Sequence, residues 1–347
     1  MKTYKYRLSP NRQQQEILNQ SIWCNRFIYN RWLQTWNEMY EAWEKCNYYT
    51  LANLLKEKKQ ELERLKVPYS QPLQQSLKNL DTAFQRFFKK KAKYPRFKKK
   101  SYGWSVCYPQ HTDIIDSYIK LPKIGMVKCN FHRELKGKVK RMTITKTPTW
   151  KYFVSILTDY DDQRTNGHGM VAIDVGIKEF GVRSDGVFIP NPRHLKKKLK
   201  RLKKQQRRLS RKQKWSSNRN KQRLRVARLH EKVSDCRKDF LHKTSTTIAK
   251  QYDTLVLENL RVRNMVKNHC LAQAISDMWW RTFRTMCEYK MKVIAVDPRN
   301  TSKTCSNCWN IANDLKLSDR TYTCVACDRE WDRDYNASLN ILARATA

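Results

Sequence analysis

The sequence is short of acidic residues and has no long hydrophobic run. Its 347 residues include 31 Asp and Glu against 72 Lys and Arg, a formal net charge of +41. A compact chain with this excess repels itself unless a polyanion neutralises it. A lipid surface is one such polyanion, but no transmembrane run, signal peptide or lipidation motif supports it. Nucleic acid, with about one negative charge per 1.7 Å of duplex, is therefore the expected partner.

Disulfides, repeats and histidine pairs are also missing. The cysteine count is odd, eleven, which is typical of reduced thiols and predicts a cytoplasmic protein rather than a disulfide framework. The seven histidines form no ligand-like pair and are assigned no function, and no internal repeat is found. Hydrophobic residues still make up 40% of the chain, which excludes wholesale disorder, and the length allows two or three domains.

Four of the cysteines have the spacing of a metal site. They form two Cys-x-x-Cys pairs separated by fifteen residues: Cys305 with Cys308, and Cys324 with Cys327. Each pair places two thiolates on one side of an ion, so four can complete a tetrahedron. Zinc is expected, with iron in the same geometry as the alternative. Four thiolates leave no open position, which favours a structural role over a catalytic one.

The first half of the chain predicts a β domain interrupted by helices. Residues Thr3–Leu8 alternate as in a strand, whereas Gln13–Lys66 and Leu73–Lys91 have helical spacing. The period returns to two over Tyr102–Thr158, as in a small antiparallel sheet. We therefore expect the helical segment to be an insertion into one β domain.

The second half predicts a mixed sheet flanked by helices. The expected strands are Met170–Val175, Phe180–Ser184, Val187–Ile189, Thr254–Leu260 and Val293–Val296, with a hairpin turn at Asp185-Gly186. The expected helices are Leu195–Leu229, Leu271–Met291 and one at the carboxyl end.

Two of these strands each carry one acid in an apolar run, at Asp174 and Glu258. Burying a lone carboxylate costs several kcal/mol, so such acids are usually paired, protonated or bound to a metal. If the strands lie side by side, the two acids share one sheet edge, and Asp334 in the first turn of the last helix approaches both. Three convergent carboxylates repel one another unless hard divalent cations lie between them.

Such a site suits phosphodiester hydrolysis, because two cations about 3.5–4 Å apart clamp the attacking water and the leaving oxygen. The alternative is that the acids are structural, salt-bridged to some of the many arginines, or a helix cap in the case of Asp334. For Asp332 we expect a cap or an arginine partner rather than a metal ligand.

The segments that carry the acids resemble a known family. Ala172–Phe180, Leu255–Leu260 and Arg333–Ser338 resemble the three motifs of RuvC-type nucleases with an RNase H-like fold. The run from Glu288 to Cys308 is similar to the insertion-sequence-encoded TnpB proteins, relatives of the compact type V CRISPR nucleases. The resemblance covers essentially the whole chain.

The resemblance implies an RNA-guided, metal-dependent DNA endonuclease. Asp174, Glu258 and Asp334 become the catalytic triad that holds Mg²⁺, as two ions, or Mn²⁺. The implied partners are a noncoding guide RNA from the same element and double-stranded target DNA with a short flanking motif. Arg320, four residues before Cys324, is expected at the scissile phosphate.

It also implies a domain plan. A wedge β-barrel-like domain spans 1–12 and 101–163, with a helical recognition domain at 13–100 inserted into it. A RuvC domain spans 164–300 and 330–347, and a zinc-ribbon module for the target nucleic acid is inserted at 301–329. Trp309 and Asp328 stand where the family usually has glycine, which predicts either altered turns around the cysteines or weaker metal binding.

Nucleic-acid contacts are expected from two basic segments. Residues 196–232 contain eighteen Lys or Arg and one acid, Glu231, and a second basic stretch covers 89–100. A solvated helical face is the usual interpretation of such a run, but this density favours binding to guide RNA or the RNA–DNA duplex. The predicted contact residues are Lys196, Lys197, Lys200, Lys204, Arg207, Arg208, Arg211, Arg96, Lys98 and Lys99.

Two other functions are compatible with these residues. One is a RuvC-like nuclease or strand-transferring transposase that uses no guide. The other is a non-catalytic, RNA-guided DNA-binding repressor, against which the intact acids argue.

Overall fold

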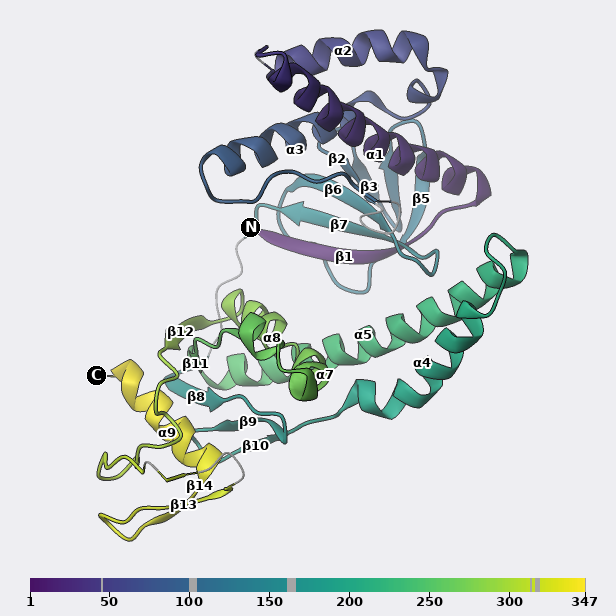
Figure 1. The fold of residues 1–347 in the computed structure, drawn as a ribbon. Coiled ribbons are helices and arrows are strands. Elements are labelled where there is room, and N and C mark those ends of the chain that lie inside the picture. The colour runs from purple at the N-terminus through teal and green to yellow at the C-terminus, as the bar shows by residue number, and fades with distance from the viewer. Residues whose placement is uncertain (45, 100–104, 161–166, 313, 316–318, 347) are drawn as a thin grey trace. The chain divides into compact units, whose positions relative to one another are not determined.

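A computed structural model describes the chain except for residues 45, 100–104, 161–166, 313, 316–318 and 347. The side chains of residues 195, 197, 263 and 270 are also outside the description. The chain forms two compact units, Met1–Asp162 and Gln163–Ala347 (Figure 1). The predicted boundaries at 100/101 and 163/164 lie outside the described residues, as does the side chain of Lys197.

The second unit is built on the predicted mixed sheet. Its strand order is β10-β9-β8-β11-β12, in which β8, β11 and β12 run parallel and β9 and β10 are antiparallel additions. This confirms the mixed sheet and the hairpin at Asp185-Gly186. The strands are β8 (Met170–Asp174), β9 (Glu179–Arg183), β10 (Phe188–Pro190), β11 (Thr254–Glu258) and β12 (Lys292–Val296).

Helices cover both faces of this sheet. On one face Val171 and Ile173 pack with residues of α5 (Ser217–Gln251), α7 (His269–Met278) and α8 (Trp280–Glu288). On the other face Ala172 packs with Val256 and with Ile341 of the carboxy-terminal helix α9 (Arg333–Thr346). The alternation of side chains along β8 and β11 therefore decides which residues face α9.

The predicted helix Leu195–Leu229 is wrong as a single element. The chain forms α4 (His194–Ser210), turns, and returns as α5, which packs against α4 as the second arm of a helical hairpin (Figure 1). Ser216 caps α5, and the Arg219 guanidinium donates to the carbonyls of Leu209 and Lys212 at 2.9 and 2.8 Å. One basic side chain thus satisfies carbonyls that the end of α4 leaves open.

The predicted helix Leu271–Met291 is also divided. A short helix α6 (Val262–Met265) follows β11, and α7 and α8 are separated at Trp279, whose backbone is left-handed with φ 54°. A left-handed residue cannot continue an α-helix, so the two helices run in different directions. Among the described residues, no helix is long and apolar enough to cross a membrane.

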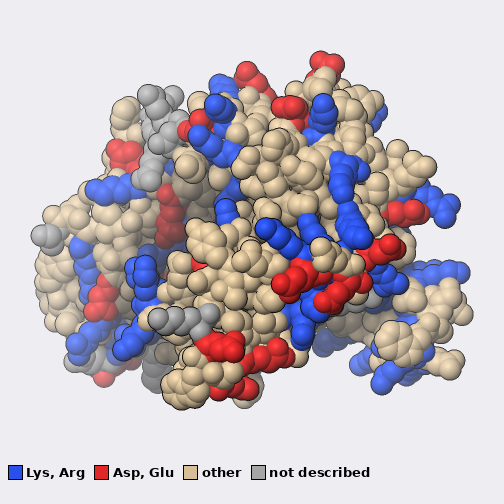
Figure 2. All heavy atoms as spheres, turned by 90° about the horizontal axis from the view of Figure 1, so that it is seen from above, with Lys and Arg blue, Asp and Glu red and all other residues tan. Residues whose placement is uncertain are grey.

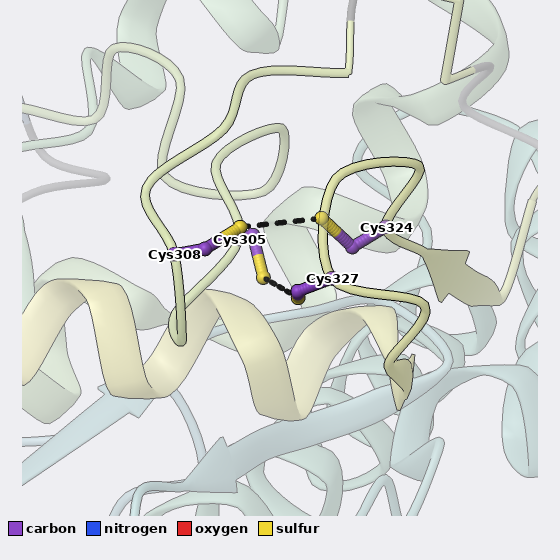
Figure 3. Close-up of side chains that lie close together, drawn as sticks. All are labelled: Cys305, Cys308, Cys324 and Cys327. Carbon is purple, nitrogen blue, oxygen red and sulfur yellow. Dashed lines mark hydrogen bonds between the residues drawn. The ribbon is translucent and has the colours of Figure 1, made fainter.

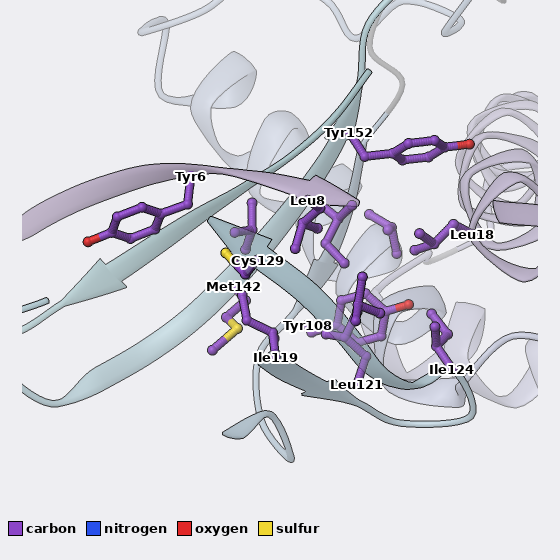
Figure 4. Close-up of a cluster of buried hydrophobic side chains, with 14 of the residues drawn as sticks. Tyr6, Leu8, Leu18, Tyr108, Ile119, Leu121, Ile124, Cys129, Met142 and Tyr152 are labelled. Carbon is purple, nitrogen blue, oxygen red and sulfur yellow. The ribbon is translucent and has the colours of Figure 1, made fainter. Parts of the chain in front are cut away.

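The first unit is an antiparallel sheet of seven strands in the order β2-β6-β7-β1-β5-β4-β3, and buried side chains fill its concave side (Figure 4). No described ladder joins the end strands β2 and β3 into a closed barrel. The strands are β1 (Lys2–Ser9), β2 (Ser105–Tyr108), β3 (Asp113–Ile115), β4 (Tyr118–Leu121), β5 (Gly125–Asn130), β6 (Val139–Lys146) and β7 (Tyr152–Thr158).

Between β1 and β2, the described residues form three α-helices, α1 (Arg12–Glu41), α2 (Tyr48–Glu61) and α3 (Ser70–Phe88), and a short 3-10 helix, Glu63–Leu65. Asn11 and Gln14 form a reciprocal capping box at the start of α1. The three helices share a core of their own around Trp32, whose indole donates to the Leu51 carbonyl at 2.7 Å.

Candidate active site and metal centre

Asp174 and Glu258 occupy equivalent positions on neighbouring strands. Asp174 is the last residue of β8 and Glu258 the last of β11. The parallel ladder pairs Leu257 with Ile173, so the next residue on each strand is an acid. Ala172 and Val256 pack against α9, and each of the two acids lies two residues after one of them. The predicted adjacency at one sheet edge is confirmed, and both acids fall on the face that α9 covers.

Asp334 reaches the same region from the first turn of α9. The Asp332 carboxylate accepts hydrogen bonds from the backbone N–H groups of Asp334 and Tyr335, both at 3.0 Å, and thereby caps the helix. The expectation that Asp332 is a cap is confirmed. The Arg320 guanidinium lies 3.9 Å from the Asp334 carboxylate, and the side chains are 52% and 25% exposed, so Arg320 stands at the open side of the acids.

The surroundings of Asp174 and Glu258 disfavour the ionised forms of both carboxyl groups. Burial raises the pKa of Asp174 well above its usual value, and the charges of Glu258 and Asp334 raise it further. Burial also raises the pKa of Glu258, while a hydrogen bond from Thr301 and the charge of Arg344 partly offset the rise. A divalent cation would remove this repulsion and favour the ionised carboxylates, so the chemistry of these donors suits a hard metal ion. Among the described residues, only the four cysteines have three or more ligand atoms close enough together to hold one ion, so the oxygen atoms of the three acids are not gathered to that degree.

Thr301 is a neighbour of the site that the sequence reasoning missed. Its hydroxyl donates to the Glu258 carboxylate at 2.5 Å, and the residue is only 3% exposed. The side-chain amide of Asn340, on α9, donates to the Thr301 carbonyl at 2.9 Å and so fixes the threonine. The sequence signal that could have pointed to this region is Asn340, an Asn on the inner face of an amphipathic helix, because a buried amide needs hydrogen-bond partners.

We expect Thr301→Val to weaken the binding of a divalent cation at the acids by about 10–100-fold, because Glu258 loses the donor that orients it. Thr301→Ser keeps the hydroxyl and is the matched control, with a midpoint close to that of the parent. Midpoints are read from the thermal stabilisation of each variant across a Mg²⁺ titration. Equal midpoints for the Val and Ser variants would show that Thr301 only fills space.

The four cysteines form one cluster beside α9 (Figure 3). All four sulfur atoms lie within 4.8 Å of one another, with Cys305 3.7 Å from Cys327 and Cys308 3.4 Å from Cys324. A tetrahedral zinc ion with Zn–S bonds of about 2.3 Å requires sulfurs about 3.8 Å apart. The residues therefore fit a zinc ion, with Cys305 and Cys324 fully buried.

Two short elements and two unusual turns surround the cluster. Strands β13 (Thr321–Thr323) and β14 (Glu330–Asp332) pair antiparallel on either side of the second cysteine pair. Trp309 and Asp328 have φ of 63° and 48°, so they adopt the left-handed conformation that glycine favours. Both residues thus adopt the backbone conformation expected of the missing glycines, so the expected alteration of the turns is wrong in this respect, while the alternative of weaker metal binding stays a prediction.

Helix α9 joins the cysteine cluster to the acids. The Asn336 side chain accepts from the Ser306 backbone N–H at 2.9 Å and donates to the Thr304 carbonyl at 2.7 Å. Asn340 donates to the same carbonyl at 2.6 Å and to Thr301. Both asparagines are buried. The loop that holds Cys305 and the residue that contacts Glu258 are therefore fixed by one helix.

The basic residues predicted to contact nucleic acid are mostly exposed. Along α4 the exposed residues are Lys196, Lys200, Lys204, Arg207 and Arg208, and Arg211 follows in the turn. Leu202 is buried where α4 packs on α5, so one face of the hairpin is structural and the other is basic. Lys and Arg side chains are also spread over the face shown in Figure 2.

The second basic segment is more ordered than a free loop. The Asn30 side chain accepts from the Lys98 backbone N–H at 2.7 Å and donates to its carbonyl at 3.0 Å. The Lys98 ammonium lies 3.8 Å from the centre of the Tyr29 ring, and burial lowers its pKa. Arg96 and Lys99 are exposed, which makes them the better candidates for phosphate contacts.

Three family profiles match the chain. Residues 153–269 match a family described as "Probable transposase", and residues 280–341 match "Cas12f1-like, TNB domain". Residues 1–45 match "Helix-turn-helix domain", although this region is one strand and one long helix in the structure.

Two relatives match over the full chain. One, from Escherichia coli K12, is named "Putative RNA-guided DNA endonuclease InsQ"; it is 34% identical, with 100% of this chain and 93% of the relative covered. Another, from Streptomyces pristinaespiralis, is named "Putative RNA-guided DNA endonuclease"; it is 36% identical over 100% of this chain and 90% of the relative. These matches define an insertion-sequence-associated protein. The chain belongs to the TnpB family.

A comparison with solved structures matches the chain to one titled "Cryo-EM structure of the Cas12f1-sgRNA-target DNA complex". It is 18% identical, 98% of each chain is covered, and the TM-score is 0.36.

Proposed function

We propose that the chain is an RNA-guided, metal-dependent DNA endonuclease of a transposable element. The proposal is supported by the position of Asp174 and Glu258 at the ends of neighbouring strands, with the charge of Asp334 on α9 raising the pKa of Asp174, in a chain whose full-length relatives bear that name. The strand order, with two antiparallel strands added to a parallel edge, supports an RNase H-like RuvC domain.

In this proposal the three acids hold Mg²⁺, or Mn²⁺, against the phosphodiester. The ions would activate water and stabilise the charge on the leaving oxygen. Thr301 orients Glu258, α9 positions Asp334, and Arg320 contributes positive charge at the open side, where a phosphate approaches. The four cysteines hold zinc and fix the loop that contains Thr301.

The remaining parts are assigned to the partners. The basic residues of the segment 196–232, in α4 and the first half of α5, bind guide RNA or its duplex with DNA, and base pairing by the guide supplies most sequence specificity. The sheet of the first unit acts as the wedge domain and α1–α3 as the recognition domain, while residues 301–329 form the module for the target strand. The protein reads a short flanking DNA motif and works in the cytoplasm, at the DNA of its host.

Reprogramming tests this function directly. The protein is purified with the RNA that copurifies, the RNA is sequenced, and its guide segment is replaced. The proposal predicts that cleavage moves to DNA that matches the new guide and requires a divalent cation. RNA-free protein that cuts equally well would favour the unguided nuclease or transposase, and guided binding without any cut would favour the repressor.

Phosphate contacts by α4 predict a specific salt dependence. For guide RNA, the slope of log affinity against log salt is expected to fall by about 2–3 when Lys196, Lys200 and Lys204 are replaced by Gln, because each phosphate contact contributes about 0.7–0.9. Affinities are measured between about 50 and 200 mM salt.

A charge-matched control uses three exposed lysines of α5, Lys238, Lys243 and Lys250. Replacing these by Gln removes the same charge and should leave the slope nearly unchanged. Equal losses for the two triple variants would mean that net charge, rather than the α4 face, governs binding.

A further inference from the structure

A cavity opens directly beside Glu258. Its volume is about 410 Å³, and it is lined by residues from the end of β11, from α6 and from α8. Glu258 and Val175, the residue after Asp174, are part of the wall. The cavity is therefore continuous with the candidate active site, and its size falls in the range of small-ligand pockets, about 300–1,000 Å³.

The lining combines an apolar wall with arginines. Buried Leu257, Trp280 and Phe283 form part of the wall. Arg261 and Arg281 line the cavity and are exposed, and among the described residues neither has a carboxylate within 4.0 Å. Arg284 also lines it but is paired with Glu288 at 2.9 Å. Flat apolar surface with unpaired guanidinium groups suits a nucleobase and its phosphate.

Trp280 supplies a second indication of an occupant. Its indole N–H is buried without a hydrogen-bond partner among the described residues. Buried donors are nearly always satisfied, and an unsatisfied one requires an explanation. Bases carry acceptor atoms along their edges, so a base in this cavity supplies a hydrogen-bond acceptor for the Trp280 indole N–H.

We propose that this cavity receives the base of an unpaired deoxynucleotide next to the scissile phosphate, and that Arg261 and Arg281 hold its backbone. This inference rests on the proposed function, because Glu258 is both a wall of the cavity and a candidate metal ligand. The base must be free of a pairing partner to enter, which favours the DNA strand displaced by the guide over the strand paired to it. The cavity thus positions the strand for cleavage.

The test uses the protein–RNA complex and a series of DNA targets. Each target has one abasic site in the displaced strand, within about three nucleotides of the mapped cut, so guide pairing is unchanged. We expect one position to slow cleavage of that strand about tenfold, since base stacking on aromatic residues is typically of that size. In Asn264→Trp, which fills the cavity from an exposed lining residue, intact DNA should be cut slowly and the abasic site should add nothing.

Arg281→Ala is expected to slow cleavage of intact DNA, whereas Lys292→Ala is the control. Lys292 is exposed and is the first residue of β12. Glu258 pairs with Val296, the last residue of β12, so Lys292 lies at the other end of the strand. Target binding and the thermal midpoint are measured for every variant, so that misfolding is recognised. An abasic effect of equal size in the parent and in Asn264→Trp would overturn the proposal, as would the absence of an effect at every abasic position in the displaced strand. Failure of the parent complex to cut any DNA would instead refute the proposed function.

Discussion

Asp174→Asn is expected to lower DNA cleavage by about 10³-fold or more while guide RNA and target DNA still bind. The substitution removes one of the three carboxylates proposed to hold the cations, and a loss of about 4 kcal/mol in transition-state stabilisation corresponds to that factor. Single-turnover cleavage and target binding are measured on the same preparations. Asp253→Asn, at the exposed residue just before the neighbouring strand β11, is the matched control and should retain activity.

The same variant should be more stable than the parent in the absence of metal. Burial raises the folded-state pKa of Asp174, so above the ordinary pKa of about 3.9 folding must either take up a proton or bury a charge. Asparagine avoids this penalty. Below about pH 4, where Asp174 is protonated in both the folded and the unfolded parent, we expect the thermal midpoints of parent and variant to coincide. As pH rises, the thermal midpoint of the variant should increasingly exceed that of the parent. Mg²⁺ should then stabilise the parent and not the variant.

Cys305→Ser is expected to release the zinc ion and lower the thermal midpoint of the second unit by about 20 °C or more. Structural zinc contributes about 10–16 kcal/mol of binding free energy in small zinc domains, and each kcal/mol lost shifts the midpoint of a domain this size by about 2–4 °C. Zinc content by elemental analysis and thermal melts measure the two effects. Cys107→Ser, in strand β2 of the first unit, is the control and should keep the full zinc content.

Cleavage should fail together with zinc binding, because α9 fixes both the loop with Cys305 and Thr301, the donor to Glu258. A chelator that removes zinc should therefore abolish cleavage, and added Mg²⁺ alone should not restore it. Full activity of a zinc-free protein would mean that the cysteine cluster and the acids are independent.

The pairing of two strands that are distant in the chain could be predicted because their sequence pattern is simple. Asp174 and Glu258 each end a short run of buried residues, and buried parallel strands have few alternatives to pairing with each other. The role of Asp332 as a cap also followed from local chemistry, because an Asp before an amphipathic segment commonly begins a helix. The metal site of the four cysteines could be predicted from their spacing alone.

Other features were hidden because polar residues in polar surroundings carry no periodic signal. The turn between α4 and α5 lies in a uniformly basic segment, and only the contacts of Arg219 identify it. The left-handed residue Trp279 divides a segment whose apolar spacing is otherwise helical. Thr301 and the two asparagines of α9 are recognised only when the fold brings them to Glu258 and to the cysteine loop.

The most direct measurement is an anomalous difference map from crystals of the protein grown with Mn²⁺. We expect manganese density between the carboxylates of Asp174, Glu258 and Asp334, and we expect this density to be lost in Asp174→Asn crystals. Manganese bound at other acids, with these three carboxylates directed away from one another, would contradict the account.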